Sequence, residues 1–284
     1  MFTGPNGWLE LSNTEFSQLS RFIYDRWGIN LPPTKRQLLE GRLRKRLSHL
    51  QMTSFQEYCS YLFSPAGIES EAPLMIDLVT TNKTEFFREA DHFEYLAHTA
   101  VPDLRSRLTS FSNDQLRVWS AGCSSGEEPY TLAMVLNECR LATPGLRVRI
   151  LATDISSRML SVAREGIYPE SRIEPIPLEW RHRYLLRSKD PSRHLVRFVP
   201  TLREMITFHR LNLMEIAAQV RDTFHVIFCR NVIIYFDKPT QEKVIRDFHQ
   251  RLTPGGYLFL GHSETLTGMN LPFLPVAPTV YRKI

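Results

Sequence analysis

The second half of the chain alternates short apolar runs with longer amphipathic stretches. The apolar runs are bounded by polar turns, which is typical of buried strands, and the stretches between them have helical spacing. This alternation predicts an α/β fold built on a doubly wound parallel sheet. Strands are predicted at the apolar run 116–119, at 148–152, at 224–229, within the turn and strand at 253–261, and at 279–282. The predicted helices are residues 130–140, 156–166 and 241–252.

Residues 178–204 interrupt this alternation. The segment begins with Trp180, Arg181, His182, Arg183 and Tyr184, and the β-prone run 195–198 follows. We therefore expect an insertion with strand character within the α/β domain.

The first 80 residues carry a purely helical pattern. The predicted helices are residues 14–27, 34–50, 54–63 and 73–80, with a loop over 64–72 that contains Pro65 and Gly67. A polar junction at residues 80–89 then leads into a helix predicted over 91–108. The junction is either a capped linker or a lid over a site in the following domain.

The helix at 34–50 has two distinct faces. Leu39, Leu43, Leu47 and Leu50 share one face, and Lys35, Arg42, Lys45, Arg46 and His49 lie on the adjacent one. Such a basic face is either solvated or a docking surface for an acidic partner helix.

Composition narrows the class of protein. The 284 residues contain 35 Lys+Arg and 30 Asp+Glu, a net charge of +5 that favours a local basic patch over a general affinity for nucleic acid. Four dispersed cysteines without a CxxC motif predict a reducing compartment and no zinc site. Residues 1–10 do not resemble a leader, and no apolar run approaches the roughly 18 residues of a membrane span. We therefore expect a soluble, cytoplasmic protein.

The most informative stretch is residues 116–130. An apolar run enters a turn with Gly122 and Gly126, after which Glu127, Glu128 and Pro129 open a helix. A glycine turn between a strand and a helix is where α/β sheets bind nucleotides, although it could also be a turn without a ligand.

The residues after the glycines limit the class of ligand that this turn can bind. A phosphate-binding loop needs Gly-Lys-Ser/Thr, whereas Gly126 is followed by two glutamates that would repel a phosphate. Ser124 and Glu127 also stand where a dinucleotide fingerprint requires glycines. A cationic cofactor with an adenosine half fits better, and S-adenosylmethionine is such a molecule.

Asp154 follows the strand at 148–152. A carboxylate at this strand end can accept hydrogen bonds from both hydroxyls of a ribose. The same residue could instead cap the helix at 156–166. Asn231, at the end of the strand at 224–229, is ambiguous in the same way.

Several stretches together resemble the bacterial chemotaxis receptor methyltransferases (CheR). The resemblance extends over nearly the whole chain from about residue 10. It is carried by the junction Thr-Thr-Asn-Lys-Thr-Glu-Phe-Phe-Arg-Glu at 80–89, the glycine turn at 118–130, the strand end at Asp154, Cys-Arg-Asn-Val-Ile-Ile-Tyr-Phe at 229–236, Leu-Thr-Pro-Gly-Gly at 252–256 and Gly-His-Ser-Glu at 261–264.

The resemblance implies a fold and an activity. It implies a helical N-terminal domain at residues 8–80, a linker at 81–90 that contributes to the cofactor site, and a class I, Rossmann-like methyltransferase domain at 91–284 with a small antiparallel β-subdomain inserted at 178–204. The implied activity is methyl transfer from S-adenosyl-L-methionine to glutamate carboxylates on the cytoplasmic helices of chemoreceptors, which leaves S-adenosyl-L-homocysteine. We expect a monomer that neither binds nucleic acid nor inserts into the membrane.

The resemblance also implies residue roles. Arg88 and Tyr235 would be catalytic and would orient the incoming carboxylate, unless Arg88 instead holds the carboxylate of the cofactor. Lys35, Arg42, Lys45 and Arg46 would face the receptor. The implied cofactor-binding residues are Asn82, Thr84, Arg88, Gly122, Glu128, Asp154, Asn212, Leu213, Arg230 and Asn231.

The chemistry is consistent with this set of residues. A glutamate has a reference pKa of about 4.3, so near pH 7 it is already ionised and needs no general base. His225 and His262 are therefore interpreted as structural. Residues 188–194 replace glycines associated with members that are tethered to a receptor C-terminal pentapeptide, which argues against such a tether.

Two other functions stay open. A methyltransferase acting on RNA would share the fold and the basic charge, but such amino-group enzymes usually carry an Asn/Asp-Pro-Pro-Tyr/Phe turn where this chain has Arg-Asn-Val-Ile at 230–233. A non-catalytic adaptor that binds S-adenosylmethionine or its product is the second alternative.

Overall fold

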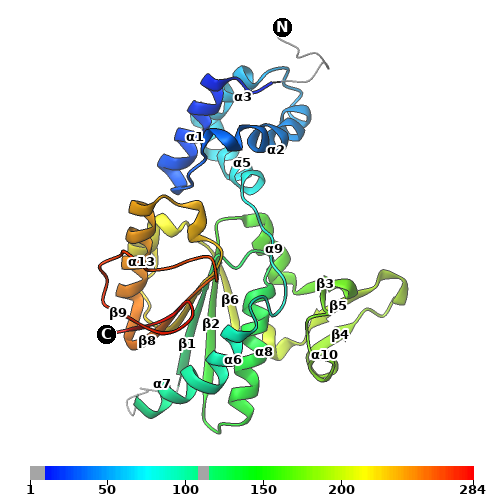
Figure 1. Ribbon diagram of the computed structural model, residues 1–284. Helices are drawn as coiled ribbons and strands as arrows, with labels where there is room; N and C mark the ends of the chain where they lie inside the picture. Colours follow the sequence, from blue (N-terminus) through cyan, green and yellow to red (C-terminus); the bar gives the residue numbers. More distant parts are fainter. Residues whose placement is uncertain (1–9, 108–114) are drawn as a thin grey trace. The chain divides into compact units, whose positions relative to one another are not determined.

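The computed structural model describes residues 10–107 and 115–284 (Figure 1). These form two compact units. The first contains residues up to Thr81 together with Tyr235–Thr240, and the second contains Asn82–Ile234 and Gln241–Ile284. The junction after Thr81 thus belongs to the second unit. The predictions for residues 1–9, including the start of the helical domain at residue 8, lie outside the described residues, as does Leu108 at the end of the helix predicted over 91–108.

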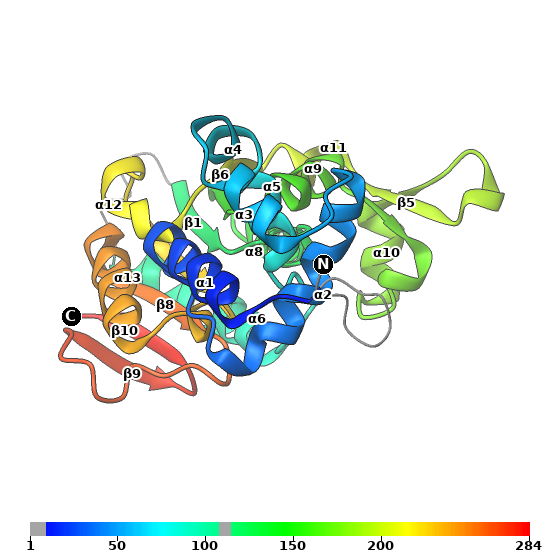
Figure 2. The same cartoon turned by 90° about the horizontal axis from the view of Figure 1, so that it is seen from above.

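The first unit is built from short helices, as predicted (Figure 2). They are α1 (Asn13–Trp27), η1 (Pro33–Lys35), α2 (Arg36–His49), α3 (Phe55–Leu62), α4 (Pro65–Ser70) and α5 (Ala72–Val79). Ser12 caps the start of α1 by accepting from the N–H of Glu15, and Gly28 ends it in the left-handed conformation. Leu39, Leu43 and Leu47 of α2 are buried as predicted, whereas Leu50 lies after the end of the helix and is only half-buried.

The loop predicted over 64–72 is wrong, because residues 65–70 form α4. Pro65 occupies the first helical turn, and Ser64 caps the helix by accepting from the N–H of Gly67. Gly67 is required by packing: a Cβ there would lie 2.0 Å from the carbonyl oxygen of Tyr61. Pro65 therefore begins a helix, and Gly67 lets that helix pack closely against the preceding segment. The two residues, which are also typical of loops, do not form one here.

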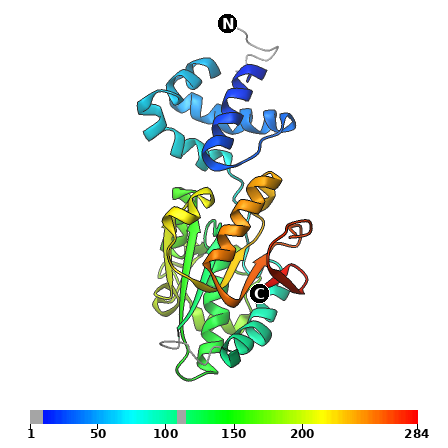
Figure 3. The ribbon, with the colours of Figure 1, turned by 90° about the vertical axis from the view of Figure 1, so that its left-hand side faces the viewer.

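The second unit contains a seven-stranded sheet in the order β6-β2-β1-β7-β8-β10-β9 (Figures 1 and 3). Strands β6, β2, β1, β7 and β8 are parallel, whereas β10 and β9 are antiparallel. This confirms the predicted α/β sheet. The strands are β1 (Gln115–Ala121), β2 (Arg147–Asp154), β6 (Ile206–Arg210), β7 (Phe224–Cys229), β8 (Leu252–Leu260), β9 (Phe273–Ala277) and β10 (Val280–Lys283).

The helices of this unit are α6 (Asp91–Tyr95), the π-helical η2 (Leu96–Ala100), α7 (Val101–Arg107), α8 (Glu127–Leu141), α9 (Ser157–Glu165), α11 (Pro200–Arg203), η5 (Leu213–Glu215), α12 (Ile216–Gln219), η6 (Ile233–Tyr235) and α13 (Lys238–Arg251), of which η6 and α13 extend into residues 235–240 of the first unit. The helices predicted over 91–108, 130–140, 156–166 and 241–252 all have counterparts in this unit, and α11, η5, α12 and η6 were not predicted. Helices α8 and α9 contact β2 and β6. Trp119 and Tyr130 are fully buried within this domain, so β1 and α8 are anchored on both sides of the glycine turn.

Two strands of the large sheet, β6 and β9, were not predicted. Both lie near the sheet edges, and β6 contains only two apolar residues besides its threonine, histidine and arginine. An edge strand needs less apolar surface than a central one, which fits the weak pattern of β6. Strand β9 is apolar but contains Pro275, and proline argues against a strand unless it lies at an edge.

The insertion forms a three-stranded antiparallel sheet in the order β3-β5-β4. Its elements are β3 (Ile167–Pro169), η3 (Glu170–Arg172), α10 (Leu178–Tyr184), β4 (Leu185–Arg187), η4 (Pro191–Arg193) and β5 (Leu195–Phe198). The first strand, β3, lies before residue 178, where the predicted insertion begins. Residues 178–184 form a helix, so the predicted strand character is wrong there. Within residues 10–107 and 115–284, every helix is too short or too polar to cross a lipid bilayer.

Candidate active site

The candidate site contains the glycine turn, which directly follows the carboxyl end of β1. Gly122 and Gly126 have φ angles of +86° and +99°, so both need the left-handed freedom of glycine. The N–H groups of Gly122 and Cys123 donate to the carbonyl of Thr153 at 2.8 and 2.9 Å. The turn is thus bonded to the end of the neighbouring strand β2.

Asp154 is placed beside this turn. Its Oδ2 accepts from the N–H of Ser124 at 2.7 Å, and its Oδ1 accepts from the N–H of Ser156 at 2.8 Å. Helix α9 is capped by Ser156, whose hydroxyl accepts from the N–H of Met159, so the alternative of Asp154 as the helix cap is wrong. The Asp154 carboxylate is held at the strand end where a ribose-binding residue is expected.

Asn212 and Leu213 lie at the adjacent strand end. The N–H of Leu211 donates to the carbonyl of Asp154 at 3.0 Å, so the chain after β6 passes directly beside Asp154. The Asn212 side chain caps η5 by accepting from the N–H of Met214 at 3.1 Å, and Leu213 is buried. The structure therefore brings these predicted residues close to the glycine turn.

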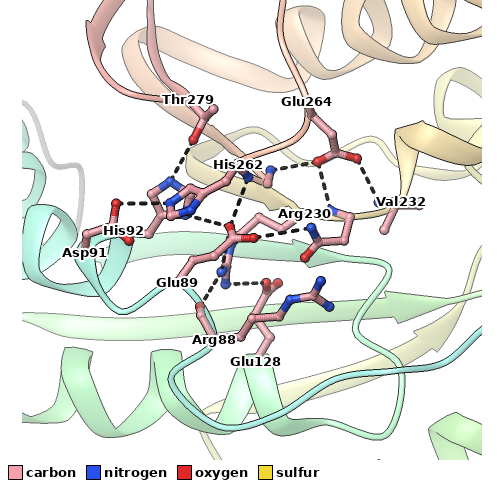
Figure 4. Close-up of polar contacts among 12 residues, drawn as sticks. Arg88, Glu89, Asp91, His92, Glu128, Arg230, Val232, His262, Glu264 and Thr279 are labelled. Carbon is pink, nitrogen blue, oxygen red and sulfur yellow. Dashed lines mark hydrogen bonds and ion pairs between the residues drawn. The ribbon is translucent and has the colours of Figure 1, made fainter.

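A buried arginine links two carboxylates in the same region (Figure 4). Arg230 Nη1 lies 3.2 Å from Glu128 Oε2, and Arg230 Nη2 lies 3.0 Å from Glu89 Oε2. The other oxygen of Glu128 accepts from the hydroxyl of Ser120 at 2.7 Å. Only 2% of the Arg230 side chain is exposed, so this ion-pair network is largely shielded from water.

Arg230 also holds the junction that precedes α6. Its Nη2 donates to the carbonyl of Arg88, and its guanidinium lies 5.3 Å from the ring centre of Phe93, within cation–π range. The guanidinium thus bonds to Arg88, Glu89 and Glu128 together. Sequence reasoning identified Arg230 and Glu128 but missed Glu89, although Glu89 ends the junction motif at 80–89.

From Asn82 onward, the junction packs against the rest of the second unit. Phe86 is buried in its core, and the N–H of Phe87 donates to Thr131 Oγ1 at 3.3 Å. The carbonyl of Asn82 accepts from the hydroxyl of Ser124 in the glycine turn at 3.2 Å. Arg88 Nη1 donates to the carbonyl of Lys83 at 3.0 Å. Thr84, the residue after Lys83, is half-buried.

The charges of the site depend on these contacts. Burial raises the pKa of Glu128, and Arg230 only partly offsets that effect. Burial also acts to raise the pKa of Glu89, but the charge and hydrogen bonds of Arg230, together with hydrogen bonds from Asn231 and His262, outweigh it, so the pKa of Glu89 lies below its usual range. Burial, together with the charge of Arg230, lowers the pKa of His92 to about 4, so that this imidazole is neutral at pH 7.

Glu89, His92 and His262 place potential metal-ligand atoms within 4.8 Å of one another. However, Glu89 Oε2 already accepts from Arg230 Nη2 at 3.0 Å and from the N–H of His262 at 3.3 Å. A guanidinium at that distance would repel a divalent cation bound to the same oxygen. We therefore interpret these side chains as part of the hydrogen-bond network around Arg230.

Glu264 was not singled out as a site residue by sequence reasoning. Its carboxylate accepts from the N–H groups of Asn231 at 2.8 Å and Val232 at 2.9 Å (Figure 4). The signal for it was the Gly-His-Ser-Glu stretch at 261–264, which follows a buried strand. The Asn231 side chain reaches Glu89 Oε1 at 3.3 Å, so Asn231 joins the same network.

The predicted docking cations differ in their surroundings within the first unit. Lys35 and Lys45 are exposed. Arg42 donates to the carbonyl of Val79 and, at 2.7 Å, to Thr81 Oγ1. Arg46 pairs with the fully buried Glu71, with 2.6 Å between Nη2 and Oε2. Two of the four predicted docking cations, Arg42 and Arg46, thus make bonds within the helical unit, and the docking role of all four stays a prediction.

Tyr235 belongs to the first unit. Its carbonyl accepts from the N–H of Asn30 at 2.8 Å, and the side chain is half-buried. The residues implied by the resemblance for cofactor binding, among them Arg88, all lie in the second unit. The pairing of Arg88 and Tyr235 as catalytic residues stays a prediction.

Both units match models of known families. Residues 14–80 match the model described as "CheR methyltransferase, all-alpha domain", and residues 82–281 match "CheR methyltransferase, SAM binding domain". The chain is 39% identical to the chemotaxis protein methyltransferase of Borreliella burgdorferi over 277 residues, which cover 97% of this chain and 96% of the relative. It is 40% identical to the chemotaxis protein methyltransferase of Escherichia coli over 273 residues, 96% of this chain and 92% of the relative.

Proposed function

Since the chain belongs to the CheR methyltransferase family, we propose that it methylates glutamate side chains of chemoreceptors, using S-adenosylmethionine as the methyl donor. The observation that carries this proposal is the match of both units to the family, at 39–40% identity over nearly the whole chain. The product on the receptor is a glutamate methyl ester, and the second product is S-adenosylhomocysteine.

The residues beside the glycine turn fit such a cofactor. The Asp154 carboxylate at the end of β2 can accept hydrogen bonds from a ribose. Carboxylates rather than cationic loops surround the turn, which suits a cofactor that has a sulfonium and an ammonium and no phosphate. The residues that would hold it are Asn82, Thr84, Gly122, Glu128, Asp154, Asn212, Leu213, Arg230 and Asn231.

The reaction makes few demands on proton transfer. The cofactor supplies an electrophilic methyl group. A glutamate carboxylate is ionised near pH 7, so the protein mainly orients it, which is the role we propose for Arg88 and Tyr235. Arg88 Nη1 donates to the carbonyl of Lys83, which holds its side chain against the junction.

A methyl-transfer assay on receptor-containing membranes tests this function. Radiolabelled S-adenosylmethionine should give labelled receptor that releases volatile methanol in alkali, because methyl esters hydrolyse under these conditions. Methyl groups on RNA bases or on nitrogen would remain bound. The matched substrate control is a receptor whose methylated glutamates are replaced by alanine, which should stay unlabelled.

Two outcomes would contradict the proposal. Alkali-stable label on RNA would favour the nucleic-acid alternative. Binding of S-adenosylhomocysteine without transfer to any receptor segment would favour the adaptor.

A further inference from the structure

The carboxylate of Glu264 is enclosed by backbone N–H groups. Its Oε2 accepts from Gly261 at 2.7 Å and from Asn231 at 2.8 Å, and its Oε1 accepts from Val232 at 2.9 Å (Figure 4). The Oε1 atom also accepts from the N–H of Ile234 at 3.4 Å. Only 4% of Glu264 is exposed, so water competes little for these bonds. Three of the four donors belong to the loop 231–234 that follows β7.

This loop needs an acceptor from elsewhere in the chain. Asn231 has a φ of +59°, a left-handed conformation that few residues other than glycine and asparagine adopt. A loop in this conformation cannot continue the ladder of β7, and buried N–H groups must find another partner. Glu264 supplies that partner for the N–H groups of Asn231, Val232 and Ile234.

The loop also contacts the glycine turn after β1. A Cβ on Gly122 would lie 2.4 Å from Cγ2 of Val232, so Val232 packs directly on the backbone of the turn. A Cβ on Gly261 would lie 2.6 Å from Nδ2 of Asn231 and 3.0 Å from Oε2 of Glu264. The chain after β8 therefore holds the loop after β7 against the turn after β1.

We propose that Glu264 is a positioning residue for the cofactor site. By binding the N–H groups of Asn231 and Val232, it fixes the Asn231 side chain and keeps Val232 against Gly122. Glu264 acts through this loop. The inference rests on the proposed function in one respect, namely the role of Asn231 in holding the cofactor.

The first test is the variant Glu264→Gln in the full-length protein. Glutamine has nearly the same size, but only one of its two terminal atoms is an acceptor, and its NH2 group would face backbone donors. We expect the dissociation constant of S-adenosylhomocysteine to rise at least tenfold by calorimetry. The amide protons of Asn231 and Val232 should exchange faster with solvent.

A second variant perturbs the same loop without changing Glu264. Gly261→Ala places a methyl group against Asn231 Nδ2, and it should raise the same dissociation constant. Glu264→Asp keeps the charge but is one methylene shorter, so we expect an intermediate value. In the methylation assay, KM for S-adenosylmethionine should rise more than kcat falls, a split that a general loss of stability would not produce.

Asp247→Asn is the matched control. Asp247 is also a buried carboxylate, and its Oδ2 has no hydrogen-bond partner among the described residues. This change can alter stability but should leave the dissociation constant unchanged.

Native affinity in Glu264→Gln and Gly261→Ala would overturn the inference, whether or not the melting temperature falls. If Glu264→Gln does not fold, Gly261→Ala and Glu264→Asp decide the outcome. The readout is binding of S-adenosylhomocysteine alone, so it is independent of the receptor. Absence of receptor methyl esters together with a tenfold loss of affinity in these variants would contradict the proposed substrate and support the role of Glu264.

Discussion

The N–H of Ser124 donates a 2.7 Å hydrogen bond to Oδ2 of Asp154. This bond joins the glycine turn after β1 to the end of the neighbouring parallel strand β2. Asp154 therefore has a structural role in addition to the ribose-binding role predicted for it, and the two roles can be separated by experiment.

We expect Asp154→Ala to weaken binding of S-adenosylhomocysteine by about 2 kcal/mol, roughly 30-fold, because charge-assisted hydrogen bonds to the ribose are lost. Calorimetry measures this change. The control is Ser156→Ala, which removes the cap of α9 and should cost about 1 kcal/mol of stability without changing the affinity. An unchanged dissociation constant in Asp154→Ala would remove Asp154 from the cofactor site.

We expect Arg230→Met to destabilise the second unit by about 3–5 kcal/mol. The change leaves the carboxylates of Glu89 and Glu128 without their shared cation in a largely buried network. Urea unfolding gives the free energy of unfolding. The double variant Arg230→Met/Glu128→Gln should recover part of the loss, because one uncompensated charge is removed. A strictly additive double variant would contradict coupling between Arg230 and Glu128.

The two kinds of cation on α2 and η1 should behave differently. Lys35→Ala/Lys45→Ala should raise KM for receptor two- to fivefold, with a smaller effect at high salt, and should leave the melting temperature and the cofactor affinity unchanged. Methylation kinetics at two ionic strengths measure this. Unchanged KM at low salt would show that these lysines do not contribute to docking.

In contrast, Arg46→Ala should lower the stability of the helical unit by about 3 kcal/mol, since it leaves the fully buried Glu71 without its cation. Thermal unfolding monitored by circular dichroism measures the loss. Arg46→Lys should keep only part of the native stability, because lysine cannot reproduce the two-point contact of the guanidinium with Glu71. Native stability in Arg46→Ala would mean that the pair with Glu71 contributes little.

Stability should fall as pH decreases from about 6.5 to about 4. Burial lowers the pKa of both His92 and His225 from 6.5 to about 4, and nearby arginines add to the effect. Between these values the unfolded chain binds more protons than the folded one, so the stabilisation is complete above pH 6.5 and is lost as the pH falls. Each histidine contributes about 3 kcal/mol over the whole range.

The variant His225→Asn isolates one of these contributions. His225 Nδ1 accepts from the N–H of Arg117 at 3.0 Å, and an asparagine oxygen can accept in its place. Unfolding in urea is measured at pH 7, 6 and 5. The slope of the unfolding free energy against pH should become less steep in the variant, and the decrease should correspond to the binding of up to one proton fewer on unfolding. An identical slope would assign the pH dependence to other groups.

The sequence by itself determined the elements with strong local patterns. Strand β7 is buried at all six positions, and its predicted bounds, 224–229, are those observed. Leu39, Leu43 and Leu47 repeat at helical spacing, so the buried face of α2 could be predicted. The glycine turn and Asp154 were predicted for the same reason: positive φ and a polar residue at a strand end are properties of short segments.

Only the tertiary structure decided which charged side chains pair with one another. Glu89, Glu128 and Arg230 are separated by 39 to 141 residues, and no local pattern indicates that one guanidinium pairs with both carboxylates. The same holds for Arg46 with Glu71 and for Glu264 with the loop after β7. Local periodicity specifies which side of an element is buried, whereas the partner of a buried charge depends on which distant segment packs against it.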